Sequence, residues 1–156
     1  MITFYTREEK NSLQKKLFNR LALVGVISLA TIALYIASFW LGIFWLSFVA
    51  GCVAVIISFT LYLIFVTPVF NQYKLINEIL RGKDEEESLT FEEVKEETLR
   101  HGVEFTKVNF KGMDFKGNFF VRTVYLQKNK ELPFMVPGED VLVTTYENII
   151  TSIKRI

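Results

Sequence analysis

The sequence predicts a membrane α-helical hairpin of two transmembrane helices that carries a small all-β cytoplasmic domain. Three observations predict this class. No charged residue occurs between Arg20 and Lys74, and a soluble protein rarely tolerates such a stretch because its helices need a polar face. Gly42 lies at the right depth to break the stretch into two helices. From Val103 onward, short β-branched and aromatic runs alternate with Gly, Asn and Pro, which is typical of strands joined by turns.

The 156 residues divide into four predicted segments. Residues 1–20 form a basic cytoplasmic N-terminal helix, and residues 21–67 form the two-helix transmembrane hairpin. Residues 68–102 hold a juxtamembrane helix, an acidic linker and a short helix, and residues 103–156 form a small β-barrel. The first helix has a predicted start, because Thr6 and Glu9 have the spacing of a capping box.

The uncharged stretch is long enough for two crossings. A helix needs about 20 apolar residues to cross a bilayer, and we expect the helices at Leu21–Leu41 and Phe44–Val66. Aromatic residues cluster around the intervening turn, where they favour the headgroup level. The basic N-terminal segment faces a turn without charge, so the positive-inside rule predicts a multi-pass cell-membrane protein with both termini in the cytoplasm.

The apolar stretch has two other interpretations, a signal peptide and a lipidation site. Leu21–Leu41 is longer than the apolar core of a signal peptide, and a second apolar helix follows it at once. Val49-Ala50-Gly51-Cys52 resembles the lipidation site of bacterial lipoproteins, but the apolar run continues well past Cys52. A small thiol packed in a helix explains Cys52 more simply.

Small residues recur at four-residue spacing in both predicted helices, a pattern that lets helix backbones approach closely in lipid. The pattern predicts packing of the two helices on each other, with contact to a partner or a second copy as the alternative. The candidate packing residues are Ala33 and Ala37 in the first helix, and Ser47, Gly51, Ala50, Ala54 and Ser58 in the second.

After Pro68, apolar residues at three- and four-residue spacing predict an amphipathic helix over Val69–Arg81, with Gly82 as its stop signal. The run Asp84–Glu87 is expected to be a solvated linker. A second capping box at Thr90–Glu93 predicts a short acidic helix ending near His101. Its glutamates form a candidate interaction surface: Glu92, Glu93, Glu96 and Glu97.

The C-terminal third predicts about five short strands. Thr106–Phe110 and Phe119–Leu126 are separated by turns at 111–114 and 115–119, with Gly117-Asn118 at the tip. Pro137-Gly138 suits a type II turn. A terminal hairpin over Val141–Tyr146 and Ile149–Ile153 turns at Glu147-Asn148. Short strands in so few residues favour a small barrel, because closure removes exposed edges.

Residues 106–156, ending with Pro137–Val143 and the turn at Glu147-Asn148, resemble the cytoplasmic OB-like barrel of NfeD-type membrane proteins. The resemblance implies an OB-like or related small barrel, and stomatin- or flotillin-like proteins as the partner class. The chain departs from that family in its two crossings and in the acidic segment before the barrel. The resemblance therefore carries fold and topology, and no functional residue.

The sequence favours a protein that is not an enzyme and that uses no cofactor or metal. His101 is the single histidine and Cys52 the single cysteine, so neither a Cys–His pair nor a Cys-based metal site is expected. The acidic glutamates lack the Gly and Asn pattern of a calcium loop. Aromatic and basic residues of the barrel invite a single-strand nucleic-acid interpretation, but the acidic run argues against nucleic acid.

The sequence thus predicts a membrane-anchored interaction or scaffold protein. Its partners are the lipid bilayer and another membrane or membrane-associated protein, with a homo-oligomer as one form of that partnership. The alternative is an accessory subunit of a transporter, secretion or toxin-immunity system that acts through its transmembrane helices. Ion or proton transport by the helices alone is disfavoured, because no ionisable residue lies within the membrane span.

Overall fold

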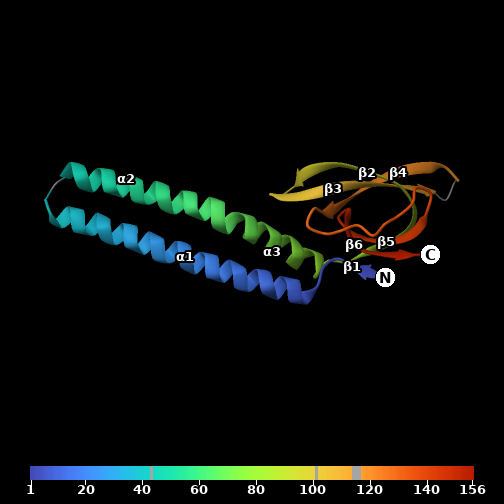
Figure 1. Cartoon of the computed structure of the whole chain (residues 1–156), viewed down its shortest axis with the longest axis horizontal. Helices are drawn as coiled ribbons and strands as arrows, with labels where there is room; N and C mark the ends of the chain where they lie inside the picture. The colour runs from blue at the N-terminus through green and yellow to red at the C-terminus, as the bar shows by residue number, and fades with distance from the viewer. Residues whose placement is uncertain (43, 101, 114–116) are drawn as a thin grey trace. The chain divides into compact units, whose positions relative to one another are not determined.

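The computed structural model describes residues 1–42, 44–100, 102–113 and 117–156. Contacts divide the chain into two units, a helical unit of Lys10–Tyr73 and a β-rich unit that combines Met1–Glu9 with Lys74–Ile156. The chain therefore begins in the β-rich unit, leaves it for the helices and returns (Figure 1). The helical unit is an insertion between two parts of the β-rich unit.

The helical unit is a hairpin. Helix α1 spans Arg7–Trp40 and helix α2 spans Phe44–Leu61. Gly42 lies in the predicted turn between them with a φ of +70°, a conformation that favours glycine. One of the two bonds of the predicted capping box is present at the start of α1, where the Thr6 hydroxyl accepts a 3.2 Å bond from the Glu9 N–H. The Glu9 carboxylate instead pairs with Lys130.

The second helical arm continues beyond the predicted crossing. A π-helical segment, η1 (Tyr62–Val66), joins α2 to α3 (Thr67–Ile79), so the predicted helix after the proline is the end of one long arm. Pro68 lies inside this continuous arm and has no N–H to donate to the preceding turn. The π-helical segment η1 directly precedes it. The two arms, Arg7–Trp40 and Phe44–Ile79, are long and apolar enough to cross a membrane by length and composition.

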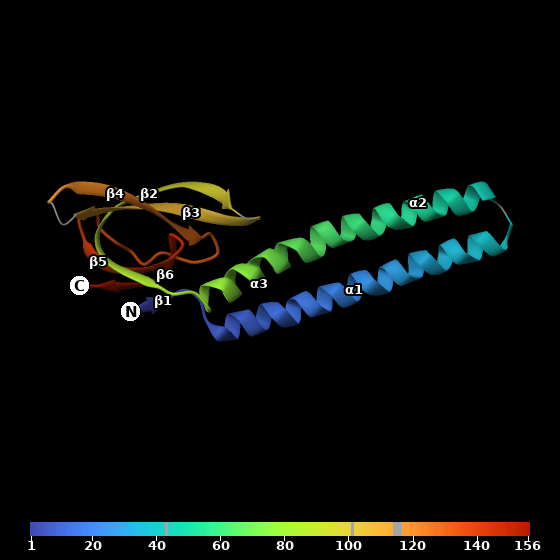
Figure 2. The same ribbon diagram turned by 180° about the vertical axis from the view of Figure 1, so that it is seen from behind.

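The β-rich unit contains a closed five-stranded barrel (Figures 1 and 2). Strands β2, β3 and β4 form an antiparallel meander, and β5 and β6 form a hairpin. Antiparallel pairing of β5 with β2 and a single parallel pair between β4 and β6 close the barrel. The strands are β2 (Glu85–Arg100), β3 (Val103–Met113), β4 (Phe119–Gln127), β5 (Asp140–Tyr146) and β6 (Ile149–Arg155).

Alternating side chains of these strands fill the barrel. Phe91 and Phe110 meet edge to face at 5.8 Å, and both are buried, as expected for aromatic pairs in a core. Other side chains with almost no exposure come from every strand of the barrel: Leu89, Val108, Val124, Leu126, Val141, Val143 and Ile150. Thus the core is mainly aliphatic, and the buried aromatic residues of its strands are Phe91, Phe105 and Phe110.

Two predicted turns are confirmed. Glu147 and Asn148 connect β5 and β6 with φ angles of 48° and 66°, the left-handed conformations of a tight hairpin turn. Gly138 has a φ of +92°, and the Glu139 N–H donates to the Val136 carbonyl at 3.0 Å. That geometry matches a type II turn with Pro137 in its first central position.

The predicted acidic linker and short helix are wrong, because Glu85–Arg100 is strand β2. The barrel therefore begins at Glu85, well before residue 103. Leu89 and Phe91 point into the core at a spacing of two, and pairing with β3 and β5 on both sides stabilises the extended chain. Register shifts occur at 91–93 and 94–97, and these bulges give the apolar residues their irregular spacing.

Two smaller predictions also differ from the structure. Residues 111–113, expected to be a turn, continue strand β3 because each pairs with β4. At the N-terminus, the predicted basic helix is preceded by strand β1 (Ile2–Thr3), which pairs with β6. His101, residues 114–116 and Ile43 lie outside the described residues.

Candidate interaction surfaces

The seam of the hairpin is built from small and polar residues. Ser47 and Ala54 of α2 are buried, as is Ser38 of α1. The Ser38 hydroxyl donates to the Tyr35 carbonyl at 2.7 Å and lies 3.5 Å from the Ser47 hydroxyl. A Cβ on Gly51 would lie 3.2 Å from the Tyr35 ring, so glycine allows this close approach of the helices.

The other candidate packing residues are less enclosed. Ala50, Gly51 and Ser58 are half-buried, whereas Ala33 and Ala37 are exposed on α1. The α1 seam instead runs through Val24 and Ser38, which are buried. An open apolar groove of about 600 Å³ lies along the seam. Its lining includes Ile32, Tyr35, Phe48, Gly51, Cys52 and Val55.

One charged side chain reaches across the hairpin. The Arg20 guanidinium donates a 2.8 Å hydrogen bond to the Phe65 carbonyl, which lies within the π-helical segment η1. A π-helical turn displaces carbonyls from the regular ladder, and a cation there offers one of them a partner. Arg20 is thus a structural contact at the end of the uncharged stretch.

The predicted acidic surface lies on strand β2, and three of its four glutamates are in ion pairs. Glu96 is exposed. The Lys128 ammonium also contacts Glu104 at 3.2 Å, and hydrogen bonds to Glu97 and Glu104 raise its pKa. Such exposed pairs contribute little stability, but they neutralise much of the acidic charge. The pairs are Glu92–Lys111 at 2.9 Å, Glu93–Lys95 at 3.1 Å and Glu97–Lys128 at 2.8 Å.

The N-terminal segment is tied to the barrel by buried groups. Tyr5 is 3% exposed, and the Lys130 ammonium lies 5.4 Å from its ring centroid. Lys130 also bonds both carboxylate oxygens of Glu9 at 2.6 Å. Burial raises the pKa of Tyr5, the Glu9 charge raises it further, and the nearby Gln127 backbone opposes the shift.

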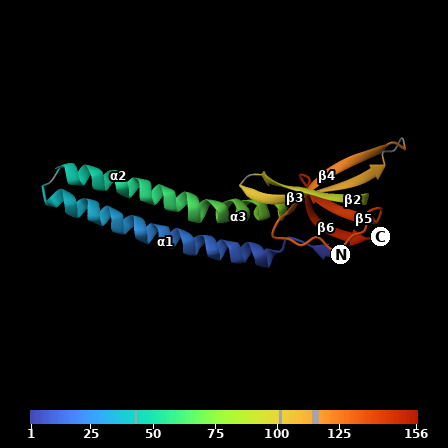
Figure 3. The same cartoon turned by 45° about the horizontal axis from the view of Figure 1, so that its top comes forward.

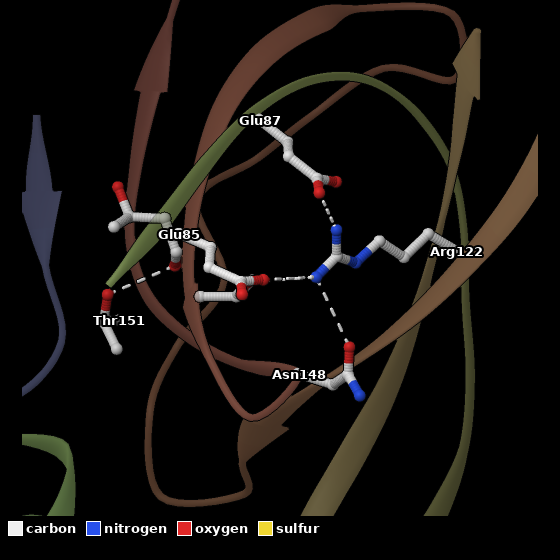
Figure 4. Close-up of polar contacts among 7 residues, drawn as sticks. Glu85, Glu87, Arg122, Asn148 and Thr151 are labelled. Atoms are coloured by element: carbon white, nitrogen blue, oxygen red, sulfur yellow. Dashed lines mark hydrogen bonds and ion pairs between the residues drawn. The ribbon is translucent and has the colours of Figure 1, made fainter. Parts of the chain in front are cut away.

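A charged cluster lies at one end of the barrel (Figure 4). Arg122 of β4 forms ion pairs with Glu87 and, at 3.5 Å, with Glu85. The same guanidinium lies 3.5 Å from the Asn148 side-chain oxygen and 3.4 Å from the Thr145 hydroxyl. Arg122 is only 19% exposed, so its charge needs these acceptors. The cluster closes the end of the core, and its cation is already neutralised.

The β3–β4 hairpin carries apolar side chains into solvent. Met113 of β3 and Phe119, Phe120 and Val121 of β4 are 64%, 74%, 42% and 56% exposed. Gly112 is matched to this arrangement, because a Cβ there would overlap the Phe120 ring. Figure 3 shows this hairpin extending past the other strands of the barrel. We call these four residues the apolar arm.

No protein family, curated protein or solved structure matches this chain. Within the described residues, no group of three or more His, Cys, Asp or Glu side chains is placed to hold a metal ion. Sequence reasoning missed the Tyr5 contact, the Arg122 cluster and the apolar arm. The run Ile2–Tyr5, rich in β-branched and aromatic residues, and the uncharged Phe119–Val121 are the signals that point to two of them.

Proposed function

We propose that this chain is a non-enzymatic, membrane-anchored interaction protein. In this proposal the hairpin of residues 21–67 crosses the bilayer and the barrel is presented to a membrane-associated partner. The observation that carries the proposal is the insertion of the hairpin between β1 and β2. Because both ends of the hairpin lead into one folded unit, they must lie on the same side of a membrane that the hairpin crosses.

The charge pattern supports a cytoplasmic barrel. Five basic residues accompany only two acidic ones in residues 1–20, and the hairpin turn has no charge. Positive residues beside a crossing are retained in the cytoplasm. They also attract anionic headgroups by on the order of 1 kcal/mol each near the surface. The protein is therefore proposed to have a multi-pass topology with its barrel and both termini in the cytoplasm.

The strand order supports an OB-like assignment for the barrel. The order β2-β3-β4-β6-β5, closed from β5 to β2, is a three-stranded meander followed by a two-stranded hairpin, and an OB fold is a five-stranded Greek-key barrel. This agrees with the resemblance to NfeD-type barrels, so a stomatin- or flotillin-like protein is the proposed partner class. The charged groups of the barrel support a role in interaction, because they are already paired with one another. Arg122 pairs with Glu87, and glutamates of β2 pair with lysines of neighbouring segments.

A second candidate is an accessory subunit of a transporter, secretion or toxin-immunity system. The specific observation in its favour is the apolar groove along the hairpin seam, whose lining includes the small residues Gly51 and Ala54 and which offers a surface to a further helix. In that case the transmembrane helices make the decisive contact and the barrel is secondary.

Crosslinking in native membranes, followed by mild-detergent purification and mass spectrometry, tests these proposals. A barrel-mediated partner is lost on Val121→Lys and kept on Gly51→Leu, while a helix-mediated partner shows the reverse. Recovery of no other protein and no second copy from wild-type membranes contradicts both.

Topology is measured separately with single cysteines in a Cys52→Ser background. Leu41→Cys in the hairpin turn, at an exposed position, and Lys154→Cys in the barrel are expected to react with an impermeant thiol reagent from opposite sides of the membrane. Reaction of both from the same side contradicts the transmembrane hairpin.

A further inference from the structure

Among the described residues, strands β2 and β4 each have an edge that lacks a neighbour over part of its length. Strand β2 pairs with β5 only through Thr90, so residues 92–100 have β3 on one side alone. Strand β4 pairs with β3 throughout but with β6 only at Tyr125, so Phe119–Thr123 has β3 on one side alone. An unpaired edge presents a row of N–H and C=O groups that can pair with another chain.

The β2 edge carries the features that prevent such pairing. Its register against β3 shifts twice, at 91–93 and at 94–97, and bulges of this kind twist an edge away from a partner strand. Charged side chains also cover it, and charges on an edge disfavour association. They are Glu92, Glu93, Lys95, Glu96 and Glu97. The acidic run of β2 therefore protects this edge of the sheet from pairing with another chain.

The β4 edge carries none of these features over the described residues. Its register against β3 runs without a shift from Met113–Phe119 to Phe105–Gln127. Phe119 and Val121 are exposed apolar residues, and Thr123 is exposed and uncharged. The one charged residue of this stretch, Arg122, faces the acceptors at the barrel end.

The backbone of this edge faces outward at known positions. The Tyr125 N–H donates to the Asn148 carbonyl on the β6 side. Because strand residues alternate with a period of two, the backbone groups of Thr123, Val121 and Phe119 face that same side. No strand of the described part of the chain pairs with them there. The free edge therefore offers three consecutive outward positions to an extended chain.

We propose that this edge pairs, antiparallel, with the same edge of a second copy of the chain. Pairing about a two-fold axis at Val121 places Phe119 opposite Thr123 of the second copy, and an isologous contact of this kind closes on itself. No like charges face each other, and aromatic or β-branched residues paired across strands are favourable. The hairpin confines both copies to one membrane, which raises their effective concentration.

This inference deepens the proposed function and rests on it, since it names a second copy as a partner of the barrel. It uses the barrel edge and makes no use of the groove along the helices. Extended segments of other proteins could also add to such an edge, and the test distinguishes them because only a second copy crosslinks through identical positions.

The test uses the full-length protein in nanodiscs that hold several copies, in a Cys52→Ser background. Val121→Cys places two thiols at the axis, where antiparallel hydrogen-bonded pairs have Cα atoms about 5.5 Å apart, within the roughly 4.4–6.8 Å range of disulfides. Mild oxidation is expected to convert most of this variant to a covalent dimer. The matched control is Leu99→Cys on the β2 edge, which is 69% exposed and is expected to stay monomeric.

Lysine substitutions give a second measurement, the oligomeric state in mild detergent. Val121→Lys is expected to lose the dimer, while Glu96→Lys on the protected edge and Val121→Thr keep it. Unchanged circular dichroism establishes that each variant is folded. Equal crosslinking of Val121→Cys and Leu99→Cys, or a monomeric wild-type protein, overturns the inference. If the wild type is monomeric but native membranes still yield a different partner, the proposed function stands alone.

Discussion

Replacing Tyr5 with alanine tests whether the N-terminal segment holds the start of α1 to the barrel. Tyr5 is 3% exposed, and truncating a buried aromatic side chain costs about 3–5 kcal/mol. Strand β1 contributes only two paired residues, Ile2 with Ile153 and Thr3 with Ser152. Net hydrogen-bond contributions of about 1 kcal/mol each do not offset that cost. We therefore expect residues 1–5 to detach while the barrel stays folded.

Amide hydrogen exchange of the full-length protein in micelles measures this directly. The Phe4 N–H donates to the Thr151 carbonyl at 2.9 Å, so its protection reports attachment. A loss of about 3 kcal/mol lowers protection on the order of a hundredfold. The buried Val124 of β4 serves as an internal reference that keeps its protection.

Phe134→Ala is the matched control, because Phe134 is 82% exposed and its removal leaves no cavity. Protection of the Phe4 amide is expected to be the same in this variant as in the wild type. If Tyr5→Ala leaves that protection unchanged, or if the Val124 amide loses protection equally, the N-terminal segment is not a separate attachment and the reasoning is refuted.

Three further predictions concern the titration of Tyr5, the barrel end and the hairpin seam. Burial raises the pKa of Tyr5, so above about pH 10 the unfolded chain loses the phenol proton while the folded chain keeps it. Stability therefore falls as pH rises past about 10. The melting temperature of the Tyr5→Phe variant is expected to fall less over this pH range. Arg122→Met leaves Glu87 without its cation and costs about 2 kcal/mol in chemical denaturation, part of which Glu87→Gln recovers. Gly51→Leu overpacks the seam against the Tyr35 ring and is expected to destabilise the hairpin in micelles by about 1–3 kcal/mol. Thermal unfolding of the helices measures this effect, and Ala33→Leu, at an exposed position, is the control that changes it little.

The sequence was sufficient to predict the hairpin and the terminal strands because their signals are local. Gly42 breaks an uncharged stretch, and the turn at Glu147-Asn148 separates two β-branched runs. In both places the residues of the turn are sufficient to determine the local backbone conformation. The closed barrel follows from several such strands in a short chain, since an open sheet would leave long edges.

Strand β2 could not be predicted in this way because its conformation depends on its neighbours. Glu- and Lys-rich sequence favours a helix locally, and Thr90 with Glu93 imitates a capping box. Pairing with β3 and β5 overrides these preferences. The two bulges also remove the regular alternation by which a strand is recognised, so Leu89 and Phe91 remain as its only core signal.

The predicted acidic interaction surface was misinterpreted for a related reason, because its residues form a strand and not a helix. A run of glutamates suggests a binding surface when it is placed on a helix, but on β2 the same residues lie along an unpaired edge beside lysines that neutralise them. The β4 edge differs from the β2 edge, because Phe119 and Val121 are exposed apolar residues on a strand of regular register.

Both edges belong to one barrel and face the same risk of unwanted pairing, yet one is protected and the other is not. An exposed apolar edge without bulges is a site of aggregation unless it is paired, which supports the proposal that the β4 edge has a partner. In the proposed function the hairpin favours such pairing, because copies anchored in one membrane are held in a common plane and at high local concentration. Under these two proposals anchoring and edge pairing act together, so removing the hairpin is expected to weaken the contact at Val121 without altering the edge itself.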